Sequence, residues 1–208
     1  MQARRGYTLV EVMVAVAVLA VCASLIMPSL DRMKAKAQRS ACVSHLRQIG
    51  TASLTYHADR GTILPWYTNA DGYWWNALTP YLGADRKIFH CPADKAYREF
   101  ALDSTISYGW NYKLTGHGDS GANPNDFVRI ATYSRPGQVP IATDGPGGPV
   151  AGQEDSWGYI DERAVHTADP KRHEGQGNTL YLDGHVEALR TEDLPNSPFF
   201  NDRPLQQQ

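Results

Sequence analysis

Histidines and acids close to the end of the chain are the first residues whose types and spacing could do chemistry. His173, Asp183 and His185 lie near one another in the sequence, and an imidazole that meets a carboxylate can bind a metal ion or exchange a proton. A zinc site normally needs three or four ligands, and no serine or cysteine nucleophile stands in a recognisable motif beside them. We therefore expect a structural role, in which Asp183 shapes a turn and His173 bonds a neighbouring loop. We assign no catalytic residue and no metal ligand.

A second candidate is Glu11, the one charged residue between Tyr7 and Leu30. Residues 12–27 carry no charge, and an apolar run of this length can cross a hydrocarbon core ~30 Å thick as a helix. A carboxylate in such a helix costs roughly 2.5–3.5 kcal/mol on insertion scales for an acid near the centre. An acid in this position is therefore a functional hypothesis by default, and Glu11 needs a partner.

The residues around Glu11 stand in a fixed register: Gly6 closes a short basic segment, Tyr7 is aromatic, and Pro28 follows in the apolar run. This pattern resembles the processing site of type IV prepilins and type II secretion pseudopilins. The resemblance implies that a membrane peptidase cleaves after Gly6 and that Tyr7, where the family usually has Phe, becomes an N-methylated N-terminus. It also implies that Glu11 of an incoming subunit neutralises the terminal amine of its neighbour.

Three export signals are the alternatives for the same segment. A secretory signal peptide with a small-residue cleavage site would place Glu11 inside its apolar region. A lipoprotein signal would need a small residue before Cys22, where the sequence has Val21. A twin-arginine signal is suggested only by Arg4 and Arg5 followed by Tyr7 and Leu9. We favour the prepilin interpretation.

The helix is expected to continue beyond the membrane run. Residues 29–59 lack proline and are rich in good helix formers, and Gly61 suits a C-terminal cap. The sequence therefore predicts a helix from about residue 8 to about residue 59, ~75–80 Å long, with Pro28 and Gly50 as places for it to bend. Its second half should turn an apolar stripe to the domain: Val43, Leu46, Ile49, Ser53 and Tyr56.

Short apolar and aromatic runs separated by turns follow Gly61. Asp183-Gly184, a dipeptide typical of two-residue turns, predicts a hairpin in which Leu182 faces His185 and Tyr181 faces Val186. A strand is expected at 139–143, with Pro140 demoting it toward an edge. The fold class expected is α+β and pilin-like, a long N-terminal helix packed on a small antiparallel sheet.

The His-x9-Asp-Gly pattern formed by His173, Asp183 and Gly184 resembles the signature of a prepilin-type family abundant in planctomycetes. Other parts similar to that family are residues 46–50 with Tyr56, residues 80–82, residues 91–94, and Tyr108 with Asn111. The resemblance spans about residue 4 to 189 and implies no activity beyond a pilin-like one.

Composition and net charge further limit the possible class of protein. The chain has 208 residues, of which 42% are hydrophobic, and a net charge of −2; without Arg4 and Arg5 the charge is −4, too acidic for a typical nucleic-acid binder. The expected organisation is a cleaved leader (1–6), a membrane or filament-core helix (7–30), its amphipathic continuation (31–60), a globular domain (61–194) and a C-terminal tail (195–208).

Two of the three cysteines should lie outside the cytoplasm. Cys22 falls in the membrane run, whereas Cys42 and Cys91 can pair in an oxidising compartment. Such a disulfide would be worth ~4 kcal/mol in the chain-entropy model. The sequence favours this disulfide over two buried free thiols.

Two further ligand-binding interpretations are weaker than structural ones. Two loops offer oxygen ligands for calcium, but their spacing does not match an EF-hand, and no cofactor is assigned. An aromatic cluster suggests carbohydrate binding, but such density more often forms a core. The calcium candidates are Asp119, Asn123, Asn125, Asp126, Asp155, Asp161 and Glu162; the aromatics are Trp66, Tyr67, Tyr73, Trp74, Trp75 and Tyr81.

The function expected from the resemblance is structural rather than enzymatic: assembly into a type IV pilus or a type II secretion pseudopilus. Its partners would be the prepilin peptidase and N-methyltransferase, other pilin subunits and an inner-membrane assembly platform. The protein would cross the inner membrane once, with its domain outside the cytoplasm. The alternative is an exported binding protein or enzyme that uses the helix only as an anchor.

Overall fold

The computed structural model describes residues 7–68, 70–83, 85–94, 106–111, 129–144 and 172–190. The chain divides into two compact units, residues 1–37 and 38–208. We call residues 7–37 the N-terminal stretch and the described residues from 38 onward the domain. The predicted leader, the C-terminal tail and the seven calcium candidates lie outside the described residues.

Helix α1, Leu9–Arg60, is a single helix of 52 residues, as predicted to within one residue at each end. It ends where Gly61 adopts a left-handed φ of 75° and donates its N–H to the His57 carbonyl at 2.8 Å, the arrangement expected of a C-terminal glycine cap. Pro28 lies inside the helix, where its missing N–H removes one backbone hydrogen bond.

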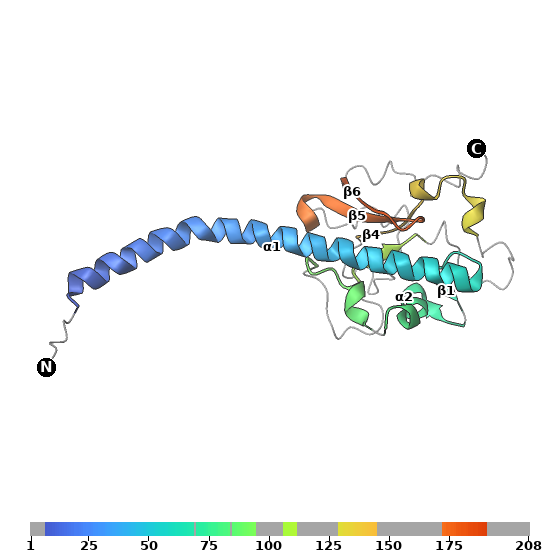
Figure 1. The fold of residues 1–208 in the computed structure, drawn as a ribbon, viewed down its shortest axis with the longest axis horizontal. Helices are drawn as coiled ribbons and strands as arrows, with labels where there is room; N and C mark the ends of the chain where they lie inside the picture. The colour runs from blue at the N-terminus through green and yellow to red at the C-terminus, as the bar shows by residue number, and fades with distance from the viewer. Residues whose placement is uncertain are drawn as a thin grey trace, which may run out of the picture. The chain divides into compact units, whose positions relative to one another are not determined.

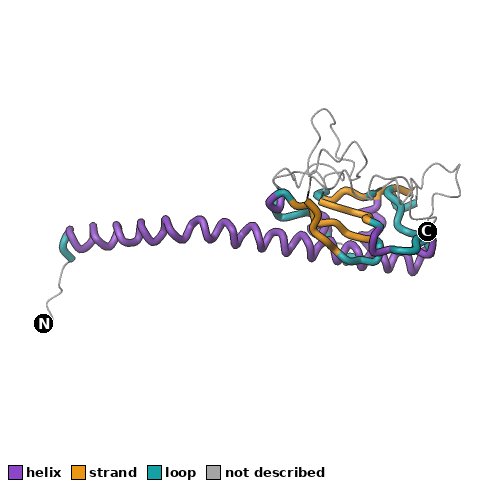
Figure 2. Tube along the Cα trace, turned by 90° about the horizontal axis from the view of Figure 1, so that it is seen from above, coloured by secondary structure: helices purple, strands orange, loops and turns teal. Residues whose placement is uncertain are grey.

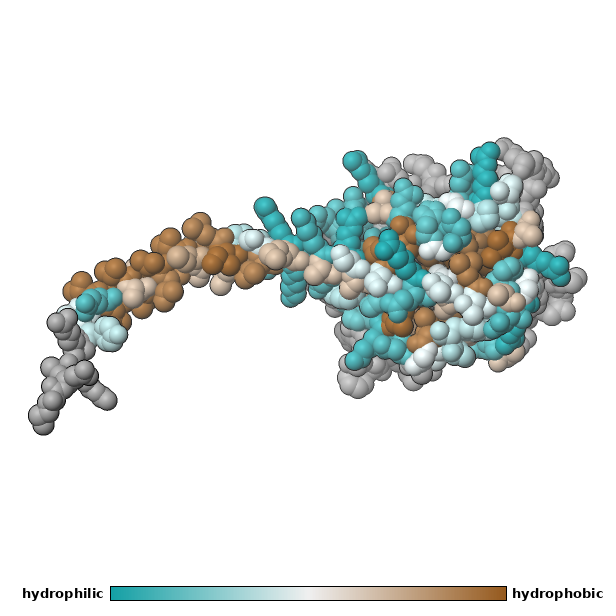
Figure 3. Space-filling model, viewed as in Figure 1, coloured by the Kyte–Doolittle hydropathy of each residue, from teal (hydrophilic) through white to brown (hydrophobic). Residues whose placement is uncertain are grey.

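The N-terminal stretch exposes its apolar side chains. Every residue from 7 to 34 is exposed, and Figure 3 shows the hydrophobic residues gathered along this part of α1. By length and composition, α1 is the one helix of the described residues that could cross a membrane. A helix that is apolar on all sides requires a non-aqueous environment or a partner.

The second part of α1 forms one wall of the domain (Figure 1). Its buried residues recur every three or four positions, and they confirm most of the predicted stripe, with Val43 half-buried. Gly50 is a point of close approach, since a Cβ there would lie 2.7 Å from Cδ1 of Leu180. Gly50 therefore allows close contact between α1 and the sheet. The buried residues are Cys42, Leu46, Ile49, Gly50, Ala52, Ser53 and Tyr56.

The sheet beside α1 has four antiparallel strands in the order β3-β4-β5-β6, which confirms the predicted α+β, pilin-like class (Figure 2). Its strands are β3 (Tyr108–Trp110), β4 (Pro140–Asp144), β5 (Gln176–Tyr181) and β6 (Val186–Arg190). A two-stranded sheet pairs β1 (Tyr67–Thr68) with β2 (Gly72–Tyr73), and helix α2 (Trp74–Leu78) follows. Short 3₁₀ helices occupy Thr79–Tyr81, Arg86–Phe89, Ile130–Thr132, Pro136–Gln138 and Arg172–Glu174.

Two expectations about this sheet are wrong. Leu180 pairs with Val186, so the hairpin loop is one residue longer than predicted. Leu182 turns inward, is 2% exposed and donates its N–H to the Val139 carbonyl. Strand β4 lies between β3 and β5 rather than at an edge. Pro140 does not prevent this, because it is the first residue of the strand, a position where proline is tolerated.

Aromatic side chains fill the other part of the core, as predicted. Trp74 is fully buried and stacks on Trp110 with ring centroids 4.8 Å apart. Trp66 and Trp75 are also buried, and the tyrosines of the cluster are partly buried against them. These rings are therefore packing residues, not an exposed platform for a sugar.

Candidate functional site

The start of α1 is organised by Thr8 and Glu11. Oε2 of Glu11 accepts hydrogen bonds from the backbone N–H and from the hydroxyl of Thr8, both at 2.8 Å. The Glu11 N–H donates back to the Thr8 hydroxyl at 3.3 Å. These bonds form a capping box, which satisfies backbone donors that the first helical turn leaves unpaired.

Thr8 was missed in the sequence interpretation, although Thr-x-x-Glu ahead of an apolar run is a recognised signal. The structure thus gives Glu11 a partner within its own chain. Tyr7, the expected N-terminus after processing, is 89% exposed, whereas Gly6 lies outside the described residues.

The structure places His173 among residues other than Asp183. Nε2 of His173 lies 3.2 Å from Sγ of Cys91 and 3.4 Å from Oδ2 of Asp144. Cys42 completes the group by donating to Oδ1 of Asp144 at 2.9 Å. We call Cys42, Cys91, Asp144 and His173 the buried polar cluster. Asp144 was missed, and the only signal for it was an acid that ends an apolar strand.

Cys42 and Cys91 come together in this cluster, where the structure has both as free thiols, so the predicted disulfide is not shown and stays a prediction. Burial raises the pKa of Cys42 above its ordinary value. A hydrogen bond with Cys42 lowers the pKa of Cys91 to about 6, and one with His173 acts in the same direction against the effect of burial. Cys22 is exposed on the N-terminal stretch.

Asp183 and Gly184 shape the exposed end of the β5–β6 hairpin. Oδ1 of Asp183 accepts from the His185 N–H at 3.0 Å and lies 2.6 Å from its Nδ1. Burial acts to raise the pKa of Asp183, but these bonds to His185 outweigh it and lower the pKa below its ordinary value. Gly184 has a φ of 91°, and Tyr181 stacks on His185. The arrangement resembles a stabilised turn more than a reactive site.

A buried ion pair lies next to the buried polar cluster. Arg172 and Asp94 are 3.0 Å apart, with both side chains almost fully buried. The Ser107 hydroxyl donates to Asp94 at 2.7 Å, and Arg172 donates to the Ser107 carbonyl. The pair thereby joins the segment that follows Cys91 to the residue that precedes His173.

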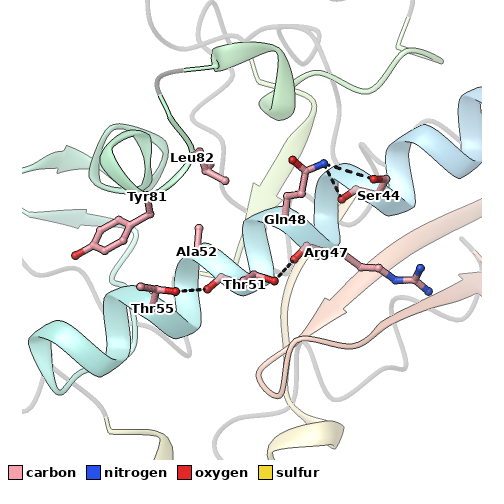
Figure 4. A pocket seen from close by; sticks show the side chains of 8 residues that line it. All are labelled: Ser44, Arg47, Gln48, Thr51, Ala52, Thr55, Tyr81 and Leu82. Atoms are coloured by element: carbon pink, nitrogen blue, oxygen red, sulfur yellow. Dashed lines mark hydrogen bonds between the residues drawn. The ribbon is translucent and has the colours of Figure 1, made fainter.

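An open groove of about 410 Å³ runs along the solvent-facing side of α1 (Figure 4). Its lining offers hydroxyls, the Gln48 amide and the Arg47 guanidinium but no acid, thiol or imidazole, and several of the hydroxyl and amide groups bond to their own helix, as Thr51 does to the Arg47 carbonyl. It carries no recognisable chemistry. The lining residues are Ser44, Arg47, Gln48, Thr51, Ala52, Thr55, Tyr81 and Leu82.

The capped apolar helix and the small sheet beside its second half define a prepilin-like protein, and residues 1–27 match the prokaryotic N-terminal methylation motif. The chain has a distant similarity to type II secretion system core protein G. Identity is 44% over 59 residues with the Klebsiella pneumoniae protein, covering 28% of this chain and 42% of the relative. It is 28% over 120 residues with the Klebsiella michiganensis protein, covering 58% of this chain and 79% of the relative. The match thus spans less than half the length of the first relative. No solved structure matches the chain significantly.

Proposed function

We propose that the chain is a structural subunit of a type IV pilus or a type II secretion pseudopilus. The observation that carries this proposal is the methylation motif at residues 1–27, which begins a helix whose apolar side chains stay exposed from residue 7 to residue 34. In this proposal a prepilin peptidase cleaves after Gly6 and Tyr7 is N-methylated. The chain crosses the inner membrane once, with its domain on the outer side, before an assembly platform adds it to other subunits.

Electrostatics give Glu11 its part in the proposal. Cleavage would create a positive amine on Tyr7, and an amine and a carboxylate that are both poorly solvated each favour an opposite charge nearby. An interaction between Glu11 of one subunit and the amine of the next would fix their axial register. Repeated without closure, such a contact produces a helical filament.

The first test is mass spectrometry of the N-terminus of the protein isolated from membranes. A chain that begins with methylated Tyr7 would support the proposal, and a Gly6→Leu variant should keep its leader. Native protein that still begins at Met1, or is cut beyond Ala20, would contradict it.

The second test separates the charge of Glu11 from its capping role. Glu11→Gln removes the charge, but Gln also fits the capping box. We expect this variant to be cleaved normally and excluded from filaments, as measured by immunoblotting of sheared filament fractions. Thr8→Ala keeps the carboxylate and weakens the cap, so it should still be incorporated. Normal incorporation of Glu11→Gln would favour a helix that serves only as an anchor.

A further inference from the structure

The buried polar cluster brings four ligand-type side chains from four separate segments to one point in the domain. Cys42 comes from α1, Cys91 follows the 3₁₀ helix Arg86–Phe89, Asp144 ends β4, and His173 precedes β5. Their ligand atoms all lie within 4.8 Å of one another. The residues are 0%, 0%, 3% and 7% exposed, respectively. Burying so many polar groups is costly unless they are paired or coordinate a metal.

The size of the cluster fits a tetrahedral ion. Metal–ligand bonds of ~2.0–2.3 Å at tetrahedral angles place neighbouring ligand atoms roughly 3.3–3.8 Å apart. Three separations in the cluster are 2.9 Å (Cys42 Sγ to Asp144 Oδ1), 3.2 Å (Cys91 Sγ to His173 Nε2) and 3.4 Å (His173 Nε2 to Asp144 Oδ2). To admit an ion, these three pairs would move apart by a few tenths of an ångström, and ligand atoms that lie farther apart, up to 4.8 Å, would move closer together.

We propose that Cys42, Cys91, Asp144 and His173 bind one Zn²⁺ ion as a closed structural site. Two thiolates and an imidazole are ligands that zinc prefers, and carboxylate oxygen is its third common donor. Calcium and magnesium are excluded because they take oxygen ligands. Two thiolates, one carboxylate and a neutral imidazole carry a charge of −3, so the site including Zn²⁺ has a net charge of −1, with the thiol protons released to solvent. All four positions are protein ligands, which is typical of a structural rather than a catalytic zinc.

Residues around the cluster orient the proposed ligands, as the outer shell of a metal site does. Oδ2 of Asp144 accepts from the backbone N–H and from Nδ2 of Asn178, both at 2.8 Å. The Tyr108 hydroxyl lies 3.2 Å from Sγ of Cys42. His173 itself has a φ of 54°, a left-handed conformation that is unfavourable for residues other than glycine. The backbone is thus held in an uncommon conformation where it presents this imidazole.

A zinc site and the disulfide expected from the sequence would use the same two thiols. They differ in whether Asp144 and His173 also take part. A Cys42–Cys91 bond would leave Asp144 and His173 as a buried pair with no chemical connection to the sulfurs. A zinc ion uses all four groups. It would also fasten α1 to β4 and to the start of β5, so part of the metal-binding free energy would become folding free energy of the domain.

The test uses the full chain, purified in detergent without chelators, and measures zinc per chain by mass spectrometry of the metal. We expect about one zinc per chain, with much less in Cys42→Ser, Cys91→Ser and His173→Gln. Two matched variants leave the cluster and the residues around it intact and should keep full zinc: Cys22→Ser for the thiols and His185→Gln for the imidazoles.

A spectroscopic measurement on the unaltered chain avoids variants that fail to fold. After zinc is removed, Co²⁺ should produce the absorption of a tetrahedral ion together with thiolate-to-cobalt charge transfer. Removing the metal should lower the thermal midpoint of the domain, and Zn²⁺ should restore it. No stoichiometric metal after incubation with Zn²⁺, an octahedral cobalt spectrum, or a Cys42–Cys91 disulfide in the native chain would each overturn the proposal. None of these outcomes depends on whether the chain enters a filament.

Discussion

The two parts of α1 have the same backbone and opposite relations to their surroundings. In the N-terminal stretch the apolar side chains are exposed, and Glu11, the one acid before Leu30, caps the helix. In the domain the helix buries its apolar stripe, and the acids Asp94 and Asp144 are buried with polar partners. The domain thus buries its apolar side chains in its own core, whereas the apolar side chains of the N-terminal stretch need lipid or another protein to cover them. A side chain removed from each part should therefore have very different consequences.

The largest effect is expected where the domain buries charge. Asp94→Asn removes one charge of the buried Arg172–Asp94 pair, and breaking a buried ion pair in this way typically costs about 3–5 kcal/mol. The free energy of unfolding can be measured by denaturant titration followed by tryptophan fluorescence, because every tryptophan lies after residue 60. The matched control is Asp71→Asn, whose partner Arg60 is half-exposed at 3.7 Å; it should cost about 0–1 kcal/mol. Equal costs for the two variants would contradict the assignment of the Arg172–Asp94 pair as buried.

One leucine from each part of α1 gives the sharpest comparison. Leu46 is fully buried, so Leu46→Ala should lower the free energy of unfolding by about 2–5 kcal/mol. Leu19 is 68% exposed in the N-terminal stretch, so Leu19→Ala should leave the fluorescence-detected unfolding of the domain unchanged. A comparable loss from Leu19→Ala would show that the stretch contributes to the folding of the domain.

The smallest effect is expected at the start of the helix. Thr8→Ala removes a side-chain cap, which costs about 0.5–2 kcal/mol, and Thr8→Ser retains the hydroxyl. Amide hydrogen exchange in micelles should be faster over the first turn of α1 in Thr8→Ala and unchanged in the domain. Unaltered exchange at the first turn would mean that the capping box does not hold this end of the helix.

Local patterns were enough to predict α1 and the fold class. The helix was predicted from the apolar run, the helix formers after Pro28 and the glycine after Arg60, and each of these signals is recognised from a few neighbouring residues. The predicted helix and the predicted fold class were both confirmed. The hairpin register was wrong because Asp183-Gly184 suits a two-residue turn, whereas the inward contact of Leu182 is made with Val139, a distant residue that precedes β4. The edge assignment of β4 failed for the same reason, since the neighbours of a strand are not encoded in its own residues.

The buried polar cluster was beyond sequence reasoning for a related cause. Cys42 and Cys91 were paired because they share a compartment, and His173 was grouped with Asp183 because they share a motif. The structure instead joins His173 to Asp144, a residue that no motif marks. Contacts between four segments this far apart depend on how the helix and the sheet pack, and a single sequence does not contain that information.

The capping box has a consequence for any assembly that uses Glu11. In the isolated chain its carboxylate already accepts two hydrogen bonds from Thr8, so it is not a charge without hydrogen-bond partners. An amine arriving from another copy would have to compete with donors that are already in place, and the net gain would be the difference between two bonded states. A subunit that leaves would recover those internal bonds at once, which makes exchange at this position less costly than the separation of an ordinary ion pair.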